Sequence, residues 1–367
     1  MQILAAVARA THSPLSLERL ELDQPRSDEI LVRIVATGVC HTDIAMRDQV
    51  FLVPQPVVLG HEGAGVVERV GDAVRKVKPG DHVVMTFNSC GRCPSCQKHW
   101  AFYCYEARSL NFGAKRSDGT SPLHSNGECI HGNFFGQSSF ANFAICNERN
   151  VVKVDRNANL EALGPLACGI QTGAGAVINA LKVAVGDSIA IFGAGAVGLS
   201  AVMAARLVGA STIIAVDRNP RRLEIARELG ATHTVNIEDE DAVQAINRTS
   251  TDGVDFSFEA TGVPRVVANA LAVLGMKGTC GMVGSFPPES STIPVDLLTI
   301  LAKGQSLRGI VEGEANPDVF IPHLIELNGQ GRFPYDRLIT YYDFAEINKA
   351  IDDAEKGIVI KPVLRMA

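Results

Sequence analysis

The feature that most constrains the fold is a glycine turn between two apolar segments. Gly193, Gly195 and Gly198 form a GxGxxG turn that follows the β-like run Ser188–Phe192 and opens the helical stretch Ala196–Val208. In such a turn one glycine makes the tight bend, one lets the backbone approach a diphosphate, and one lets the helix pack on the strand. An acidic residue also ends the next apolar run. This context predicts a dinucleotide-binding βαβ unit, with the diphosphate at the helix N-terminus.

The acidic residue is Asp217, 19 residues beyond Gly198. Its carboxylate is expected to accept hydrogen bonds from the adenosine ribose and to repel a 2′-phosphate, which favours NAD over NADP. Arg222, with Arg218 and Arg221, follows closely and could soften that preference. We therefore expect Asp217 and Arg222 to bind the cofactor.

Strands alternate with helices after about residue 160, which indicates a parallel sheet, and we expect six strands in a doubly wound α/β domain. The first third instead has short strands and turns typical of a mostly antiparallel β domain. A tail helix at 343–357 precedes a final strand. The other expected strands are 30–36, 65–70, 82–85, 212–216, 254–258 and 279–283, with a further helix at 221–229 that Asn219 and Pro220 begin and Gly230 ends.

Four cysteines lie within 15 residues: Cys90, Cys93, Cys96 and Cys104. Four thiolates suit a tetrahedral structural zinc with no open position. An iron–sulfur cluster is the main chemical alternative. Disulfides are disfavoured, because the spacing is tight and no secretory signal is visible.

The charge and apolar pattern exclude some partners. Lys plus Arg is 34 against 40 for Asp plus Glu, a net charge of −6, which argues against nucleic-acid binding. The uncharged stretches 162–181 and 188–205 are interrupted by glycines, so we interpret them as buried core and not as membrane spans. We expect a cytoplasmic protein with no membrane partner.

Cys40, His61 and Cys168 are candidate metal ligands, but they lie far apart in sequence and no spacing rule joins them. A lone buried cysteine or histidine is more often an ordinary core residue. Chemistry alone leaves both interpretations open.

The order of the motifs resembles the zinc-dependent medium-chain alcohol dehydrogenases over essentially the whole chain. Within that family the chain is most similar to bacterial aryl-alcohol dehydrogenases and their geraniol-oxidising relatives. The motifs that carry the family resemblance are GVCHTD (38–43), GHEGAG (60–65), CGRCPSC (90–96) with Cys104, and GAGAVG (193–198) with Asp217. The segments of the closer likeness are FFGQSSFA (134–141), GPLACGIQTGAGAV (164–177) and DGVDFSFEATG (252–262).

The resemblance implies a role for each matching residue. Cys40, His61 and Cys168 match the catalytic zinc ligands. Glu62 matches a carboxylate that can approach the metal, and Asp43 matches a group that orients His61. The other matching residues are Thr42 (alcohol proton), Thr172 (nicotinamide), His41 and Lys361 (cofactor diphosphate), and Phe51 and Phe134 (substrate pocket, or else simple core).

One departure concerns the proton relay. Many relatives carry a histidine three residues after Thr42, where this chain has Ala45. The relay is then expected to end in the cofactor ribose and water, or to divert through His41.

The resemblance also implies the fold and the reaction. We expect a GroES-like catalytic β domain over 1–165, a Rossmann NAD-binding domain over 166–303, and a return segment over 304–367 that completes the catalytic domain, with the active site in the cleft between the domains. With NAD and two zinc ions per chain, the enzyme would interconvert primary aromatic (benzylic) or allylic alcohols and aldehydes. Alternatives are a glutathione-dependent formaldehyde dehydrogenase, a geraniol- or perillyl-type terpene alcohol dehydrogenase, and an NAD-binding redox sensor. A homo-dimer or homo-tetramer is expected.

Overall fold

A computed structural model describes residues 1–125 and 127–366 of the chain and divides them into two compact units. The first unit comprises Met1–Cys168, Asn316–Glu326 and Asp336–Ala367. The second unit comprises Gly169–Ala315 and Leu327–Tyr335. In the part of the chain that is described, no helix combines the length and apolarity needed to cross a bilayer.

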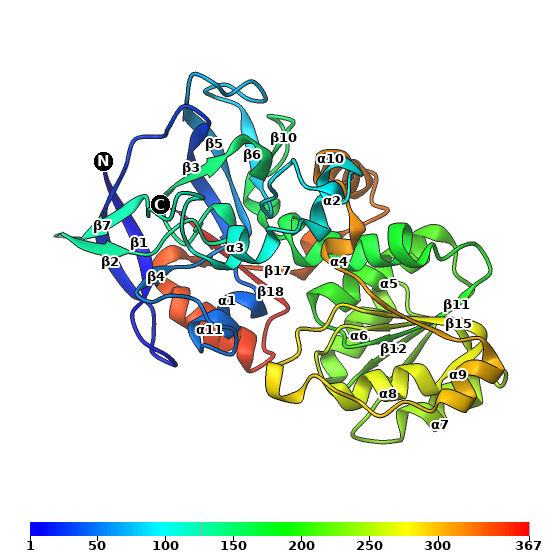
Figure 1. The fold of residues 1–367 in the computed structure, drawn as a ribbon. Coiled ribbons are helices and arrows are strands. Elements are labelled where there is room, and N and C mark those ends of the chain that lie inside the picture. Colours follow the sequence, from blue (N-terminus) through cyan, green and yellow to red (C-terminus); the bar gives the residue numbers. More distant parts are fainter. Residues whose placement is uncertain (126, 367) are drawn as a thin grey trace. The chain divides into compact units, whose positions relative to one another are not determined.

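The second unit is built on a six-stranded parallel sheet in the order β13-β12-β11-β14-β15-β16. This doubly wound order reverses between β11 and β14, where ligands bind in open α/β sheets. Helices α5 and α8 lie on opposite faces of the sheet (Figure 1). The elements are α4 (Gly169–Gly175), a π-helical turn (Ala176–Leu181), β11 (Ser188–Phe192), α5 (Ala196–Val208), β12 (Thr212–Asp217), α6 (Pro220–Leu229), β13 (His233–Asn236), α7 (Ala242–Thr249), β14 (Val254–Glu259), α8 (Pro264–Ala272), β15 (Leu274–Met282), α9 (Leu297–Lys303) and β16 (Ser306–Gly309).

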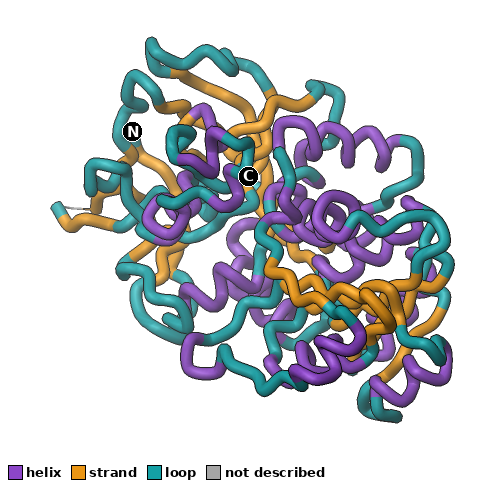
Figure 2. Tube along the Cα trace, turned by 45° about the vertical axis from the view of Figure 1, so that its right-hand side comes forward, coloured by secondary structure: helices purple, strands orange, loops and turns teal. Residues whose placement is uncertain are grey.

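The first unit holds two further sheets, whose strands pair mostly antiparallel, as expected. One has the order β4-β1-β2-β7-β8, and the other the order β10-β6-β5-β3-β18-β17 with β9 also on β3. Figure 2 shows how much of this unit consists of loops between strands. The elements are β1 (Gln2–Ala8), β2 (Ser16–Leu22), β3 (Glu29–Gly38), α1 (His41–Arg47), β4 (Val57–Val58), β5 (Gly63–Val70), β6 (His82–Met85), α2 (Pro94–Gln97), α3 (Ala107–Phe112), β7 (Leu123–Ser125), β8 (Glu128–Ile130), β9 (Phe143–Asn147), β10 (Val151–Val154), α10 (Pro317–Gly329, which runs on into the second unit), β17 (Ile339–Asp343), α11 (Ile347–Glu355) and β18 (Lys361–Arg365).

Local signals set several elements where the sequence predicts them. Helix α6 begins as expected, because the Asn219 side chain accepts a hydrogen bond from the N–H of Arg221 and Pro220 holds the first helical position. Gly230 ends it with a φ of 128°. The returning tail also completes the first unit as predicted, because β18 pairs with β3.

Three boundaries differ most from the prediction, one between units and two of single elements. The second unit continues to Ala315, past the expected end at 303, because the sixth strand is β16, whose four residues are all exposed and give no apolar signal. Strand β15 begins at Leu274, where glycines mask the strand pattern. The tail helix α11 begins only at Ile347, because residues 344–346 form a separate 3₁₀ turn.

Candidate metal and cofactor sites

Asp43 joins the first two predicted metal-ligand segments. Cys40 precedes α1, and its backbone N–H donates to Asp43 Oδ2 at 3.1 Å. The other carboxylate oxygen, Oδ1, accepts from the N–H of Gly60 at 3.0 Å and lies 2.8 Å from Nδ1 of His61. Asp43 is buried, so these contacts are shielded from water. The carboxylate therefore orients the His61 ring through Nδ1 and leaves its Nε2 as the ring atom available to a ligand.

Cys40, His61 and Cys168 converge in the first unit. One ligand atom from each, together with a carboxylate oxygen of Glu62, lies within 4.8 Å of the others. Nε2 of His61 is buried and has no hydrogen-bond partner among the described residues. Two thiols and an unsatisfied imidazole nitrogen are the donor set of a catalytic zinc site that keeps one open position. The residues present therefore fit a zinc ion.

The electrostatics of this cluster favour an added positive charge. A hydrogen bond from Cys168, and then the charge of Lys361, hold the pKa of the Cys40 thiol well below its usual range. Burial disfavours a charged His61 ring, but the Asp43 carboxylate outweighs burial and raises the pKa of His61 well above its usual value. A site that stabilises a thiolate and attracts a proton to the imidazole suits a divalent cation.

Glu62 is held by a buried lysine. Nζ of Lys361 donates to both carboxylate oxygens of Glu62, at 2.9 and 3.0 Å, and to the carbonyl of Val39 at 3.2 Å. Both side chains are almost inaccessible, with 3% of the Lys361 side chain and none of that of Glu62 exposed. Burial raises the pKa of Glu62 to about 7, although Lys361 opposes the shift. In this structure the ammonium of Lys361 therefore faces Glu62, and its expected contact with the cofactor stays a prediction.

Gln137 supports the His61 segment, and no separate sequence signal singled it out. Its side-chain Nε2 donates to the carbonyls of His61 and Met85, and its Oε1 accepts from the N–H of Gly63. Gln137 is 1% exposed, so water does not reach this place. Its side-chain amide therefore supplies the hydrogen bonds that these buried backbone groups need. Its place within FFGQSSFA, a segment of the closer likeness, is the only signal that pointed towards it.

Cys90, Cys93, Cys96 and Cys104 form a second cluster in the first unit, with sulfurs within 4.8 Å of one another. The Sγ atoms of Cys90 and Cys96 are 4.0 Å apart, as are those of Cys93 and Cys104, so these pairs are free thiols. Sulfurs at the corners of a tetrahedral zinc site would be about 3.8 Å apart, given Zn–S bonds of about 2.3 Å. The cluster fits the predicted structural zinc.

The glycine turn of the second unit leaves no room for a side chain at two of its three glycines. Gly193 has a φ of 96°, and a Cβ on Gly198 would lie 1.7 Å from the carbonyl oxygen of Gly193. A Cβ on Gly195 would meet nothing within 4 Å, so this position is open to a ligand. Asp217 accepts hydrogen bonds from the N–H groups of Ala194 at 2.6 Å and Asn219 at 2.8 Å. The turn therefore fits a nucleotide diphosphate.

For four other residues predicted to bind the cofactor or relay the proton, the structure gives only a position. His41 begins α1 and is exposed, and Thr42 follows it with its Oγ1 3.9 Å from Sγ of Cys40. Arg222 has a buried Nε without a hydrogen-bond partner in the described part of the chain. Thr172 lies on α4 in the second unit. The roles predicted for these four residues stay predictions.

The two predicted pocket residues are part of the first unit's core. Phe134 is fully buried, with its ring centroid 5.9 Å from that of His61, and Phe51 packs against the same hydrophobic cluster. Phe135, which the sequence did not single out, stacks on His61 at 4.6 Å. The aromatic side chains thus give the His61 ring an apolar backing, and the predicted pocket roles of Phe51 and Phe134 stay predictions.

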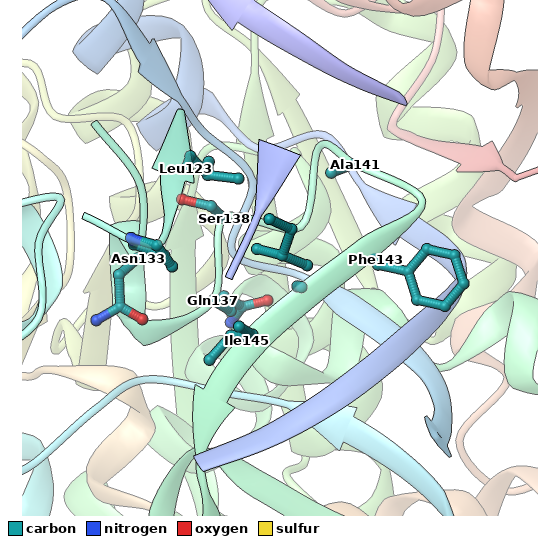
Figure 3. Close-up of a pocket in the computed structure, with 10 residues that line it drawn as sticks. Leu123, Asn133, Gln137, Ser138, Ala141, Phe143 and Ile145 are labelled. Atoms are coloured by element: carbon teal, nitrogen blue, oxygen red, sulfur yellow. The ribbon is translucent and has the colours of Figure 1, made fainter. Parts of the chain in front are cut away.

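A small cavity lies behind Gln137, between β9 and the segment that carries Ser138 (Figure 3). Its volume is about 10 Å³, which is room for roughly one water molecule. Its walls include Leu123, Asn133 and Phe143. It is too small for an aromatic alcohol, and we assign it no substrate.

Family models match both halves of the chain. Residues 26–156 match the alcohol dehydrogenase GroES-like domain, and residues 196–327 match the zinc-binding dehydrogenase domain. The chain therefore belongs to the zinc-binding alcohol dehydrogenases, with zinc and a nicotinamide dinucleotide, NAD(P), as its cofactors.

Individual relatives narrow the comparison. The chain is 48% identical to a geraniol dehydrogenase of Castellaniella defragrans over 98% of this chain and 96% of the relative. The crystal structure of an alcohol dehydrogenase zinc-binding domain protein from Burkholderia ambifaria is 51% identical, with a TM-score of 0.98 over 100% of this chain and 99% of that one. That of benzyl alcohol dehydrogenase from Acinetobacter calcoaceticus is 45% identical, with a TM-score of 0.96 over the whole of both chains. The resemblance inferred from the motifs is confirmed.

Proposed function

We propose that this alcohol dehydrogenase oxidises primary benzylic or allylic alcohols reversibly to aldehydes, with NAD as the hydride acceptor. The observation that carries the proposal is the convergence of Cys40, His61 and Cys168 around the unsatisfied Nε2 of His61. The named activities of the similar proteins, on geraniol and on benzyl alcohol, support the substrate class.

Each residue of the proposed active site has a separate role in the reaction. When bound, zinc acts as a Lewis acid on the alcohol oxygen and the nicotinamide accepts a hydride. Asp43 orients His61, and Lys361 holds the carboxylate of Glu62. Thr42, close to Cys40, takes the alcohol proton through its hydroxyl. Because Ala45 carries no titratable group, the acceptor beyond Thr42 would be the ribose of a bound cofactor with water, or else His41.

The preference for NAD rests on Asp217. Its carboxylate ends β12 and is held by two backbone N–H groups, so it stays at the position where the adenosine ribose of a dinucleotide is bound. A negative charge there opposes a 2′-phosphate. Kinetic efficiency with NAD should exceed that with NADP, and the reverse order would remove Asp217 from this role.

The deciding experiment is a steady-state panel of benzyl alcohol, geraniol and short aliphatic alcohols with NAD, alongside a metal count. We expect the highest efficiency on the benzylic or allylic alcohols and two zinc ions per chain. Highest efficiency on short aliphatic alcohols would contradict the substrate class. Activity on benzyl alcohol without glutathione separates this function from a glutathione-dependent formaldehyde dehydrogenase.

We also propose that the enzyme assembles with further copies of itself through the second unit. Strand β16 ends the sheet with all four residues exposed, and such an edge can pair with its own symmetry mate. Near it in sequence, α9 exposes Leu297, Leu298 and Leu301, each more than 70% accessible. A second copy of this chain offers the same strand edge and the same leucines, and so matches both.

A further inference from the structure

Glu259 is a buried carboxylate that the proposed mechanism does not use. It is the last residue of β14, and none of its surface is accessible. Its register partner on the neighbouring strand β11 is Phe192, the residue that precedes Gly193 of the cofactor turn. Glu259 therefore lies at the point where the strand order reverses and where the dinucleotide is expected.

One oxygen of Glu259 organises the loop that follows β14. Oε1 accepts hydrogen bonds from the N–H of Thr261 at 2.6 Å and the N–H of Gly262 at 2.9 Å, and also from the Thr261 hydroxyl. The same hydroxyl accepts from the N–H of Val263 at 3.1 Å. A single carboxylate oxygen and a single hydroxyl thus fix the start of this loop.

The fixed loop abuts the cofactor turn. A Cβ built on Gly193 would lie 2.9 Å from the methyl carbon Cγ2 of Thr261, so that methyl packs directly on the Cα of Gly193. The N–H of Ala260 donates to the carbonyl of Phe192 at 3.0 Å. Residues 260 and 261 therefore form a wall against the turn, and the position of that wall depends on Glu259.

The second oxygen of Glu259 is buried at a cost in desolvation free energy. Oε2 is buried without a hydrogen-bond partner among the described residues, and a Cβ on Gly284 would lie 2.4 Å from it. Burial raises the pKa of this carboxyl group. An apolar residue would fill the same place without that desolvation cost, so packing alone does not explain a carboxylate here.

We propose that Glu259 is a positioning residue for the nicotinamide dinucleotide, holding Thr261 against Gly193 so that the turn keeps the shape that binds the diphosphate. The inference rests on the proposed use of NAD. It assigns Glu259 an effect on cofactor affinity that it exerts through the loop and not by contact with the reacting atoms.

The test measures NADH dissociation constants for the zinc-loaded enzyme by NADH fluorescence, together with kcat and the KM for NAD. Glu259→Leu removes the acceptor and should weaken NADH binding about tenfold, equivalent to about 1.4 kcal/mol. The KM for NAD should rise with it, while kcat at saturating cofactor falls by a smaller factor. Glu259→Gln keeps an amide oxygen in place of Oε1 and should lie between the wild type and Glu259→Leu.

Thr261 provides the conservative comparison. Thr261→Val keeps the shape but loses the hydroxyl, and should weaken NADH binding in the same direction as Glu259→Leu. Thr261→Ser keeps the hydroxyl and should bind NADH more tightly than Thr261→Val. The double variant Glu259→Leu/Thr261→Val should be less impaired than the two single effects combined, because each single variant already removes the hydrogen bond between the Thr261 hydroxyl and Oε1.

Ser257→Ala is the matched control, since Ser257 is buried two residues earlier and on the same face of β14. It should leave the dissociation constant unchanged. Unaltered NADH affinity in Glu259→Leu and Thr261→Val, or an equal loss in Ser257→Ala, would overturn the proposal. If Glu259→Leu does not fold, Glu259→Gln and Thr261→Val carry the test. A wild type that binds NADPH in place of NADH would refute the NAD preference alone, and the same variants would then be measured with NADPH.

Discussion

At the scale of single residues, the ion pair of Lys361 and Glu62 links two segments that are far apart in the chain. Both charges are buried, so each has lost its hydration and depends on the other. Removing one partner therefore costs more than removing both. The sequence motifs did not reveal this pairing, because nothing in the spacing of residues 62 and 361 signals contact.

Lys361→Met should lower the unfolding free energy by about 3–5 kcal/mol, because it leaves the buried carboxyl group of Glu62 without the ammonium that offsets its desolvation. Lys361→Met/Glu62→Gln should recover most of that loss. Chemical denaturation of the zinc-loaded enzyme measures both. Equal destabilisation by the single and double variants would show that the ion pair itself does not set the effect.

Thr42→Val should abolish turnover, since it removes the hydroxyl expected to take the alcohol proton while keeping the shape of the side chain. Thr42→Ser should retain much of the activity. Zinc content and NADH affinity should stay at wild-type levels in both variants, which the same preparations can verify. Full activity in Thr42→Val would show that the proton leaves by another route.

At the scale of elements, the lobe around α2 depends on metal more than on packing. Helix α2 has four residues and buries only Ser95, too little apolar surface to stabilise a lobe. The four thiols of the lobe, those of Cys90, Cys93, Cys96 and Cys104, lie close to one another instead. The sequence could predict that these four cysteines cluster, because they lie within one short segment, but it left zinc and an iron–sulfur cluster open as the occupant.

Cys96→Ser should reduce the zinc content from two ions per chain to one and make the segment around residues 90–104 sensitive to proteolysis. The remaining zinc, held by Cys40, His61 and Cys168, should be retained. Metal analysis and limited digestion measure both effects. Loss of both ions, or of neither, would contradict two independent sites.

Zinc binding at the four-cysteine lobe should release protons and weaken as the pH falls. Backbone N–H groups of Tyr105 and Cys96 lower the pKa of Cys93 to about 6, so this thiol is already ionised at neutral pH. Burial raises the pKa of Cys104 to about 12, so Cys104 must lose a proton to bind metal. Calorimetry in buffers of different ionisation enthalpy counts the protons, and pH-independent zinc affinity would contradict this assignment.

At the scale of the whole molecule, the exposed leucines of α9 are the clearest sign of assembly. A face that exposes 74% of Leu298 and 80% of Leu301 to water is unfavourable in a monomer. Leu298→Asp should shift the enzyme towards the monomer in sedimentation analysis, whereas Leu52→Asp, at an exposed leucine of the first unit, should not. A monomeric wild type would contradict the proposed assembly.

The sequence by itself determined what depends on neighbours along the chain. The glycine turn with Asp217, the caps of α6 and the four-cysteine lobe each follow from residues that interact within one βαβ unit or one loop. Hydrogen bonds and ligand spacings within such short segments depend only on residues close together in sequence. Their local structure could therefore be predicted before any tertiary contact was known.

Only the tertiary structure decided the features that need distant segments to meet. Cys40, His61 and Cys168 come together only in the folded first unit. Asp43 holds the start of α1 against the loop that carries His61, and Cys168, more than 100 residues further along the chain, lies beside both. The Lys361–Glu62 pair, the support from Gln137 and the exposed sixth strand likewise carry no local signal. Sheet register and burial set these contacts, and both are properties of the folded chain as a whole.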